Sequence, residues 1–189
     1  ALINRPRVLL LDEPLGALDL KLRKQMQLEL KRLQRKLNIT FIYVTHDQEE
    51  ALTMSDRIAI MHDGVLDQLD TPSEIYENPK TRFVATFIGE TNTFDGCIRS
   101  IDGEHISVMI ENGNICGCGK GFALNEYITV SVRPEKMKYS ETPIDGFTVK
   151  AVVKDYVYVG SVIKCIVSLP NGNEIKIERL SGEELPKPG

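Results

Sequence analysis

Val8-Leu-Leu-Leu-Asp-Glu-Pro14 joins four aliphatic residues to two acids and a proline, and Leu15-Gly-Ala-Leu-Asp19 follows without a break. A short apolar run that ends at a proline predicts a buried strand over Arg7 to Asp12. A second run, Thr40 to Thr45 (TFIYVT), is β-branched and aromatic and predicts another buried strand. The first part of the chain is therefore expected to be an α/β structure.

The residues between these strands predict an amphipathic helix. From Asp19 to Leu37, apolar residues recur at intervals of three and four, and a basic face from Lys21 to Lys36 lies between them. This face is read as solvated, with an anionic membrane surface as the alternative. Strand, helix and strand in this order predict parallel pairing. The capping-box spacing of Asp47 and Glu50 then predicts a helix that runs to about Met54.

The chain changes character near residue 90. Before that point we expect a hairpin around His62-Asp63-Gly64 and short helices near Ser73 to Glu77 and Lys80 to Ile88. Only three of the 14 glycines precede residue 92, and short alternating segments separated by turns follow it. The segments read as strands are Phe94 to Ile101, His105 to Ile110, Tyr127 to Arg133, Phe147 to Tyr158, Val162 to Leu169 and Glu174 to Glu178. The sequence thus predicts an α/β domain over residues 1–90 and a small all-β barrel or sandwich over 91–189.

Composition excludes several classes of protein. The 189 residues are 42% hydrophobic and 26% charged, which argues against disorder and fibrous repeats, and the net charge of -4 argues against nucleic acid as a partner. The aliphatic runs are too short to span a membrane. Cys116-Gly-Cys118 lacks a second close pair for a zinc site, so free thiols in or beside a turn are favoured over metal binding.

Two acids and a histidine follow the predicted parallel strands. Because the carboxyl ends of such strands meet at one edge of the sheet, Asp12, Glu13 and His46 should face the same crevice. Asp12 is suited to hold Mg²⁺ directly or through water, and Glu13 can polarise an attacking water. Alone, His46 could be an ordinary surface histidine and the acids a solvated pair, but their shared position favours the site.

The chain resembles the later half of an ABC transporter ATPase subunit, a member of the P-loop NTPases. Three stretches carry the resemblance: Val8 to Pro14, Leu15 to Asp19 and Val44-Thr-His-Asp47. They match its Walker B strand, D-loop and switch histidine. The resemblance implies that Asp12 coordinates Mg²⁺ through water, that Glu13 is the general base for ATP hydrolysis, and that His46 contacts the γ-phosphate. It also places a D-loop of Gly16, Ala17, Leu18 and Asp19 at a dimer interface, although the family usually has serine where this chain has Gly16.

The later part of the chain narrows the resemblance. Phe83 to Glu90, Val132-Arg-Pro-Glu135 and Tyr158 to Ser161 resemble importers with a C-terminal regulatory (TOBE) domain related to the OB fold, and Phe87 to Asn92 is most similar to the spermidine/putrescine importers. The resemblance implies ATP and Mg²⁺ as cofactors and a homodimer of ATPase subunits. It also implies integral-membrane permease partners, an indirectly coupled substrate-binding protein, and a peripheral location on the cytoplasmic face of the cell membrane.

The phosphate-binding sequence G-x-x-x-x-G-K-[ST] does not occur in this chain. Gly113 to Lys120 has one residue too many and ends in Lys-Gly, and Leu180-Ser-Gly-Glu-Glu184 only imitates the family's signature. By the resemblance, the Walker A loop, glutamine loop and signature would all lie upstream of Ala1. We therefore expect this piece alone not to hydrolyse ATP.

Alternatives remain at three points. The chain could be a dimerisation or ligand-binding regulatory module without catalysis, or an ATPase of the same superfamily used in DNA repair or translation, against which a β-rich tail would count. Asp19 could serve only as a helix cap, a role that is compatible with the D-loop. Arg133 and Glu135 could form a local ion pair at a barrel edge or make a regulatory contact.

Overall fold

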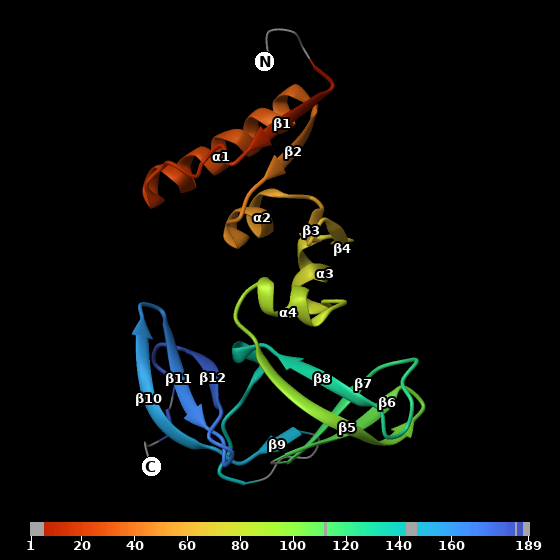
Figure 1. Cartoon of the computed structure of the whole chain (residues 1–189). Coiled ribbons are helices and arrows are strands. Elements are labelled where there is room, and N and C mark those ends of the chain that lie inside the picture. Colours follow the sequence, from red (N-terminus) through yellow and green to blue (C-terminus); the bar gives the residue numbers. More distant parts are fainter. Residues whose placement is uncertain (1–5, 112, 143–146, 184, 187–189) are drawn as a thin grey trace. The chain divides into compact units, whose positions relative to one another are not determined.

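The chain divides into two units, residues 1–89 and 90–189, in the computed structural model, which describes residues 6–111, 113–142, 147–183 and 185–186 (Figure 1). Among the helices of these described ranges, none has both the length and the apolar composition that crossing a membrane requires.

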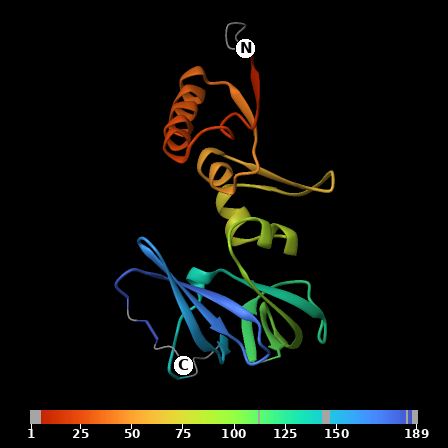
Figure 2. The same ribbon diagram turned by 60° about the vertical axis from the view of Figure 1, so that its left-hand side comes forward.

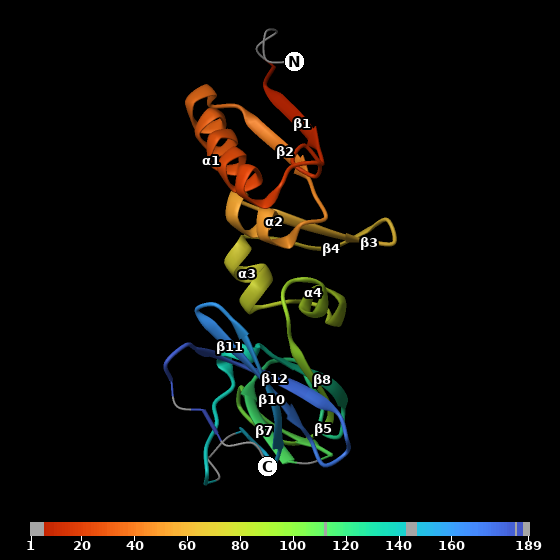
Figure 3. The same ribbon diagram turned by 90° about the vertical axis from the view of Figure 1, so that its left-hand side faces the viewer.

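The first unit contains the expected strand, helix and strand. β1 (Val8–Asp12) pairs in parallel with β2 (Thr40–Val44), and α1 (Leu20–Leu37) connects them and lies beside the pair (Figures 1 and 3). The register sets Asp12 opposite Val44. α1 begins because the Asp19 side chain accepts a hydrogen bond from Leu22 N, and it ends at Asn38 in a left-handed conformation. The predicted helix and the parallel pairing are confirmed.

The prediction that both strands are buried is wrong. Alternate residues along β1 and β2 face solvent, and the side chains of Leu10, Ile42 and Val44 are 72%, 48% and 53% exposed. The other face, with Phe41 and Tyr43, is half-buried. The described sheet contains only these two strands, so one of its faces has no cover. The apolar composition of the two strands could not reveal the uncovered face, because composition indicates that a strand favours burial but not whether another element covers it.

The rest of the first unit surrounds a small core. It comprises α2 (Gln48–Met54), β3 (Ile58–His62), β4 (Val65–Asp70), α3 (Pro72–Glu77) and α4 (Arg82–Phe87). β3 and β4 form the predicted antiparallel hairpin, and the positive φ angles of Asp63 and Gly64 make its tight turn. Ile58, Ile75 and Val84 are buried in the core between the hairpin and the two short helices.

The second unit is a small β domain, as the sequence predicts, and its strands form two antiparallel sheets (Figure 2). The strands are β5 (Asn92–Asp102), β6 (His105–Ile110), β7 (Gly113–Cys118), β8 (Tyr127–Val132), β9 (Phe147–Val149), β10 (Val152–Val159), β11 (Val162–Ser168) and β12 (Glu174–Leu180). One sheet has the order β8-β5-β6-β7-β9, and the other has β10-β11-β12. Ile98 and Val108 of the first sheet and Val167 of the second belong to one buried core.

Two details of the β domain were not predicted. The single strand expected over Phe147 to Tyr158 is divided, because Lys150 and Ala151 separate β9 in one sheet from β10 in the other. β7 was also missed: Cys116 and Cys118 are free, exposed thiols on a strand and not in a turn. A strand rich in glycine and asparagine lacks the β-branched signal on which sequence reading depends.

Asn92 joins the start of β5 to the last strand of the domain. Its side-chain Oδ1 accepts a hydrogen bond from Lys176 N at 2.8 Å, and its Nδ2 donates to Lys176 O at 2.7 Å. The residue is buried, so these bonds satisfy amide groups that water does not reach. The amide thus pairs with β12 as another strand's backbone would.

Candidate functional site

Glu13 and His46 meet at the carboxyl ends of β1 and β2. Glu13 N donates to Val44 O at 2.9 Å, which extends the pairing of the strands by one residue. Beyond that bond, His46 Nδ1 lies 3.1 Å from Glu13 Oε1. Both side chains remain accessible, with 53% of Glu13 and 74% of His46 exposed. The arrangement places a carboxylate and an imidazole side by side on an open edge, where both can reach a bound molecule.

The backbone at Glu13 has an unusual conformation. Its φ angle is 43°, in the left-handed region that non-glycine residues seldom adopt. The chain turns here, because Pro14 cannot continue the strand ladder and Gly16 N donates back to Glu13 O at 3.2 Å. Conformations of this kind cost roughly 1–3 kcal/mol and occur preferentially at functional sites. The turn is what directs the Glu13 side chain towards the end of β2.

Asp12 is the last residue of β1 and is exposed. An exposed carboxylate fits the preference of Mg²⁺ for oxygen ligands, of which protein carboxylates commonly supply one or two and water and phosphate the rest. Within the described part of the chain, no group of three histidine, cysteine or acidic residues is arranged to hold a metal ion.

The loop Gly16 to Asp19 has a defined shape. Leu15, just before it, is only 3% exposed and anchors the loop, and Leu18 N donates to Leu15 O at 3.1 Å. Asp19 closes the loop, where its Oδ1 accepts from Leu22 N at 3.0 Å. The helix-cap reading of Asp19 is thus confirmed, whereas Gly16 and Ala17 are exposed and free to contact another surface.

A buried carboxylate binds the residue that precedes His46. Glu50 is 3% exposed, and its Oε2 accepts hydrogen bonds from Tyr43 OH at 2.9 Å and Thr45 Oγ1 at 2.8 Å. Burial, followed by the hydrogen bond to Glu50, raises the pKa of Tyr43 well above its usual range. The tyrosine therefore stays neutral and keeps donating to the carboxylate. These contacts bind Thr45, the residue before His46, to Glu50 of α2.

The capping-box prediction at Asp47 is half correct. Asp47 Oδ1 accepts from Glu50 N at 3.2 Å, as the motif requires. The Asp47 N–H, however, donates to Thr45 Oγ1 at 3.0 Å, because the Glu50 carboxylate is engaged by Tyr43 and Thr45. Sequence reasoning missed the role of Glu50. The alternation of β2 was the available signal, since it places Tyr43 and Thr45 on one face.

Arg23 was also misread, as part of a solvated basic face. Its side chain is only 26% exposed, and its Nη1 lies 3.0 Å from Asp47 Oδ2 while its Nη2 donates to Leu18 O at 3.0 Å. Its Nε lies 3.9 Å from Glu50 Oε1. The position of Arg23 one turn after the cap Asp19 was the only sequence signal that it lies next to the loop. Its partners depend on how α1 crosses β2, which the sequence does not reveal.

In the β domain, Arg133 is 6% exposed and its Nη1 donates to Glu90 O at 3.2 Å, while Glu135 lies in a 3-10 helix over Pro134–Lys136. The Glu90 side chain bridges Lys164 at 2.8 Å and Lys176 at 3.2 Å. These hydrogen bonds, first that from Lys164, lower the pKa of Glu90. Arg133 therefore contacts the first residue of this unit, Glu90, and its regulatory role stays a prediction.

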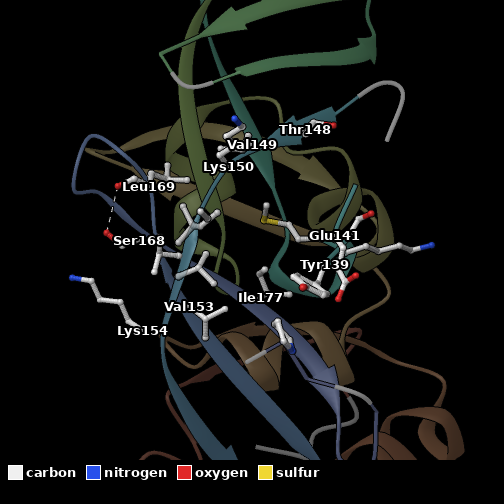
Figure 4. A pocket seen from close by; sticks show the side chains of 18 of the residues that line it. Tyr139, Glu141, Thr148, Val149, Lys150, Val153, Lys154, Ser168, Leu169 and Ile177 are labelled. Carbon is white, nitrogen blue, oxygen red and sulfur yellow. Dashed lines mark hydrogen bonds between the residues drawn. The ribbon is translucent and has the colours of Figure 1, made fainter. Parts of the chain in front are cut away.

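A cavity of about 770 Å³ opens in the β domain (Figure 4). Val153, Leu169 and Ile177 contribute apolar side chains to its lining, which also includes Lys138, Lys150 and Lys154. Lys154 pairs with Glu174 at 3.5 Å, but within the described ranges no carboxylate lies in ion-pairing distance of Lys138 or Lys150. The cavity is of the size that holds small molecules.

Comparison with known proteins extends these observations. Residues 130–189 match the family model of the TOBE domain. The chain is 50% identical over 188 residues to the spermidine/putrescine import ATP-binding protein PotA of Rubrobacter xylanophilus, covering 97% of this chain and 49% of that protein. The PotA proteins of Roseobacter denitrificans and Salmonella typhi are each 48% identical to it. The first match covers 97% of this chain and 51% of the relative, and the second covers 98% of this chain and 50% of the relative. The chain thus spans about half the length of the curated relatives it matches, and it corresponds to their C-terminal half.

Proposed function

From this match to the C-terminal half of import ATP-binding proteins, we propose that the chain is the later part of an ATP-hydrolysing subunit of an ABC importer, and that the importer carries polyamines. The observation that carries the proposal is the 3.1 Å approach of His46 to Glu13 at the ends of two parallel strands. In this reading, the first unit is part of a P-loop NTPase sheet. The substrate class rests on the names of the relatives.

The geometry suggests a role for each group. Asp12 would hold Mg²⁺, which supplies charge neutralisation for the phosphates of ATP. Glu13 would accept a proton from the attacking water, because its carboxylate is accessible and projects beyond the strand ends. His46 would orient that carboxylate through its Nδ1 and use the rest of its ring to contact the γ-phosphate. The bonds of Thr45 and Asp47 would hold the imidazole in place.

The proposal includes partners. The exposed residues Gly16 and Ala17 would contact a second copy of the subunit, so that two subunits close over two ATP molecules. The dimer would act on integral-membrane permease subunits from the cytoplasmic face, with a substrate-binding protein coupled indirectly. The phosphate cradle would come from sequence outside these 189 residues, and the piece alone would be inactive.

The test is ATP turnover by the full-length protein with Glu13→Gln. Loss of the general base should lower kcat by about 10²–10⁴-fold while ATP binding persists. Glu29→Gln is the matched control, because it makes the same change on an exposed face of α1. An unchanged rate in Glu13→Gln would refute the proposed catalysis. Spermidine and putrescine uptake by reconstituted vesicles, absent with Glu13→Gln, tests the substrate class.

The inactivity of the piece is tested separately. The purified 189-residue chain should show no phosphate release above a buffer blank at millimolar ATP. Turnover by the chain that disappears with Glu13→Gln would contradict this part of the proposal, since it would mean that ATP is held without the missing cradle.

The cavity of the β domain favours a second candidate function, a regulatory ligand site. Its apolar side suits an apolar body, and the ammonium groups of Lys138 and Lys150, which form no ion pair with another described residue, suit a small anion. Decanoate should therefore bind, decanol should bind more weakly, and Lys150→Gln should reduce the difference between them. Equal binding of decanoate and decanol would show that the lysines of the cavity do not favour an anion, and would contradict this candidate function.

A further inference from the structure

Arg23 connects the two loops that flank the Glu13–His46 edge. Its guanidinium donates to Leu18 O, in the loop before α1, and pairs with Asp47, next to His46, each at 3.0 Å. We infer that Arg23 is a positioning residue, which holds the loop Gly16 to Asp19 in a fixed position relative to the histidine loop, the residues Thr45 to Asp47 between β2 and α2. The inference rests on the proposed function, because it assigns a role to the contact between two loops of that site.

The chemistry of the contact requires arginine. A guanidinium is planar and presents its N–H groups as a rigid fork, so Nη1 and Nη2 can serve two acceptors at once. Lysine carries its donors on one compact ammonium, so it would not reproduce the two separate nitrogens that bind Leu18 O and Asp47 here. With 26% of the Arg23 side chain and 29% of Asp47 exposed, water screens the pair less than it screens a surface ion pair.

The histidine side of the connection is itself rigid. Asp47 caps α2 through Glu50 N and donates its own N–H to Thr45 Oγ1, while Glu50 holds Thr45 and Tyr43. The position of Asp47 therefore determines the position of His46 between these bonds. A displacement of Leu18 by a neighbouring subunit would move the Arg23 fork, and through Asp47 it would move His46 relative to Glu13.

The competing explanation is that Arg23 only fastens α1 to α2. A second ion pair joins the same two helices: Lys24 Nζ lies 3.1 Å from Glu49 Oε1, with side chains 55% and 61% exposed. The pair touches neither loop. A variant of this pair can therefore distinguish the two explanations. Lys24→Gln is thus a matched control, which removes one charge from the α1–α2 contact and leaves the loops connected.

The experiment compares Arg23→Lys, Arg23→Gln and Lys24→Gln in the full-length protein. For Arg23→Lys we expect a melting temperature close to that of the unchanged protein, an unchanged KM for ATP, and a kcat lowered by about 10-fold to 100-fold, as small misplacements of reacting groups produce. Arg23→Gln should lower kcat at least as much, and Lys24→Gln should change neither kcat nor KM.

Wild-type kcat in Arg23→Lys would overturn the inference, and so would equal losses in Arg23→Gln and Lys24→Gln. Glu13→Gln, measured in the same preparation, separates this failure from failure of the proposed function. If Glu13→Gln abolishes turnover and Arg23→Lys does not lower it, only the role of Arg23 is wrong. If Glu13→Gln retains full turnover, the proposed catalysis itself is wrong.

Discussion

Glu90 makes the stability of the β domain depend on pH. Hydrogen bonds from Lys164 and Lys176 lower its pKa below the ordinary value of 4.5. A carboxylate with a lowered pKa in the folded state contributes stability above its unfolded pKa, and this contribution is lost as the pH falls through the folded value. Glu90→Gln should therefore destabilise the chain near neutral pH and have progressively less effect below pH 4.5.

Urea unfolding followed by circular dichroism at several pH values checks this prediction. Glu104→Gln is the control, because Glu104 pairs with a single exposed lysine, Lys120, at 2.7 Å. Isolated exposed pairs contribute about 0–1 kcal/mol, so its pH dependence should be shallower. If the two variants lose the same free energy of unfolding at every pH, the second lysine at Glu90 adds no stability and the prediction is wrong.

Single residues differed in how well the sequence predicted them. The proximity of Glu13 and His46 followed from strand order alone, because parallel strands carry their carboxyl ends to one edge. The roles of Arg23 and Glu50 did not follow from the sequence, because each depends on a contact between two different elements. Arg23 binds Asp47, 24 positions later, and Glu50 binds Tyr43, 7 positions earlier. The periodicity of a sequence predicts which side chains share one face of a helix or strand, but not which side chains of another element contact that face.

At the scale of the element, α1 depends on its first residue. Asp19→Ala removes the acceptor for Leu22 N and should destabilise the chain by about 1 kcal/mol, within the range of roughly 0.5–2 kcal/mol for such caps. Asp19→Asn keeps an acceptor at the same position and should be nearly neutral. Thermal unfolding followed by far-UV circular dichroism tests both, and an equal loss in the two variants would show that charge matters here and capping does not.

Elements with strong local signals were predicted well, and weak ones were not. The interval pattern of α1 and the β-branched run of β2 gave nearly their observed bounds. β7 was missed because Gly113, Asn114 and Gly117 favour turns locally, and its pairing with β6 overrides that preference. The break between β9 and β10 depends on which sheet each segment joins, and the local sequence does not determine that.

At the scale of the whole molecule, the uncovered face of β1 and β2 should make the chain self-associate. The face carries four apolar side chains between 47% and 72% exposed, which are Val8, Leu10, Ile42 and Val44. Such patches favour association in water. Sedimentation velocity of the 189-residue chain should show larger species as concentration rises, and Leu10→Glu should reduce them.

Leu28→Glu is the control for this association, because Leu28 is 61% exposed on α1 and lies outside the face. It should reduce association less than Leu10→Glu does. A chain that stays monomeric at all concentrations would contradict the prediction.

The double hydrogen bond between Asn92 and Lys176 has a consequence for synthesis on the ribosome. The two residues are 84 positions apart, so the first residue of β5 emerges long before its partner exists. At typical elongation rates this delay is about 4–17 s. During it, the amide that is buried in the finished domain must remain hydrated, because its partner in β12 has not yet been synthesised.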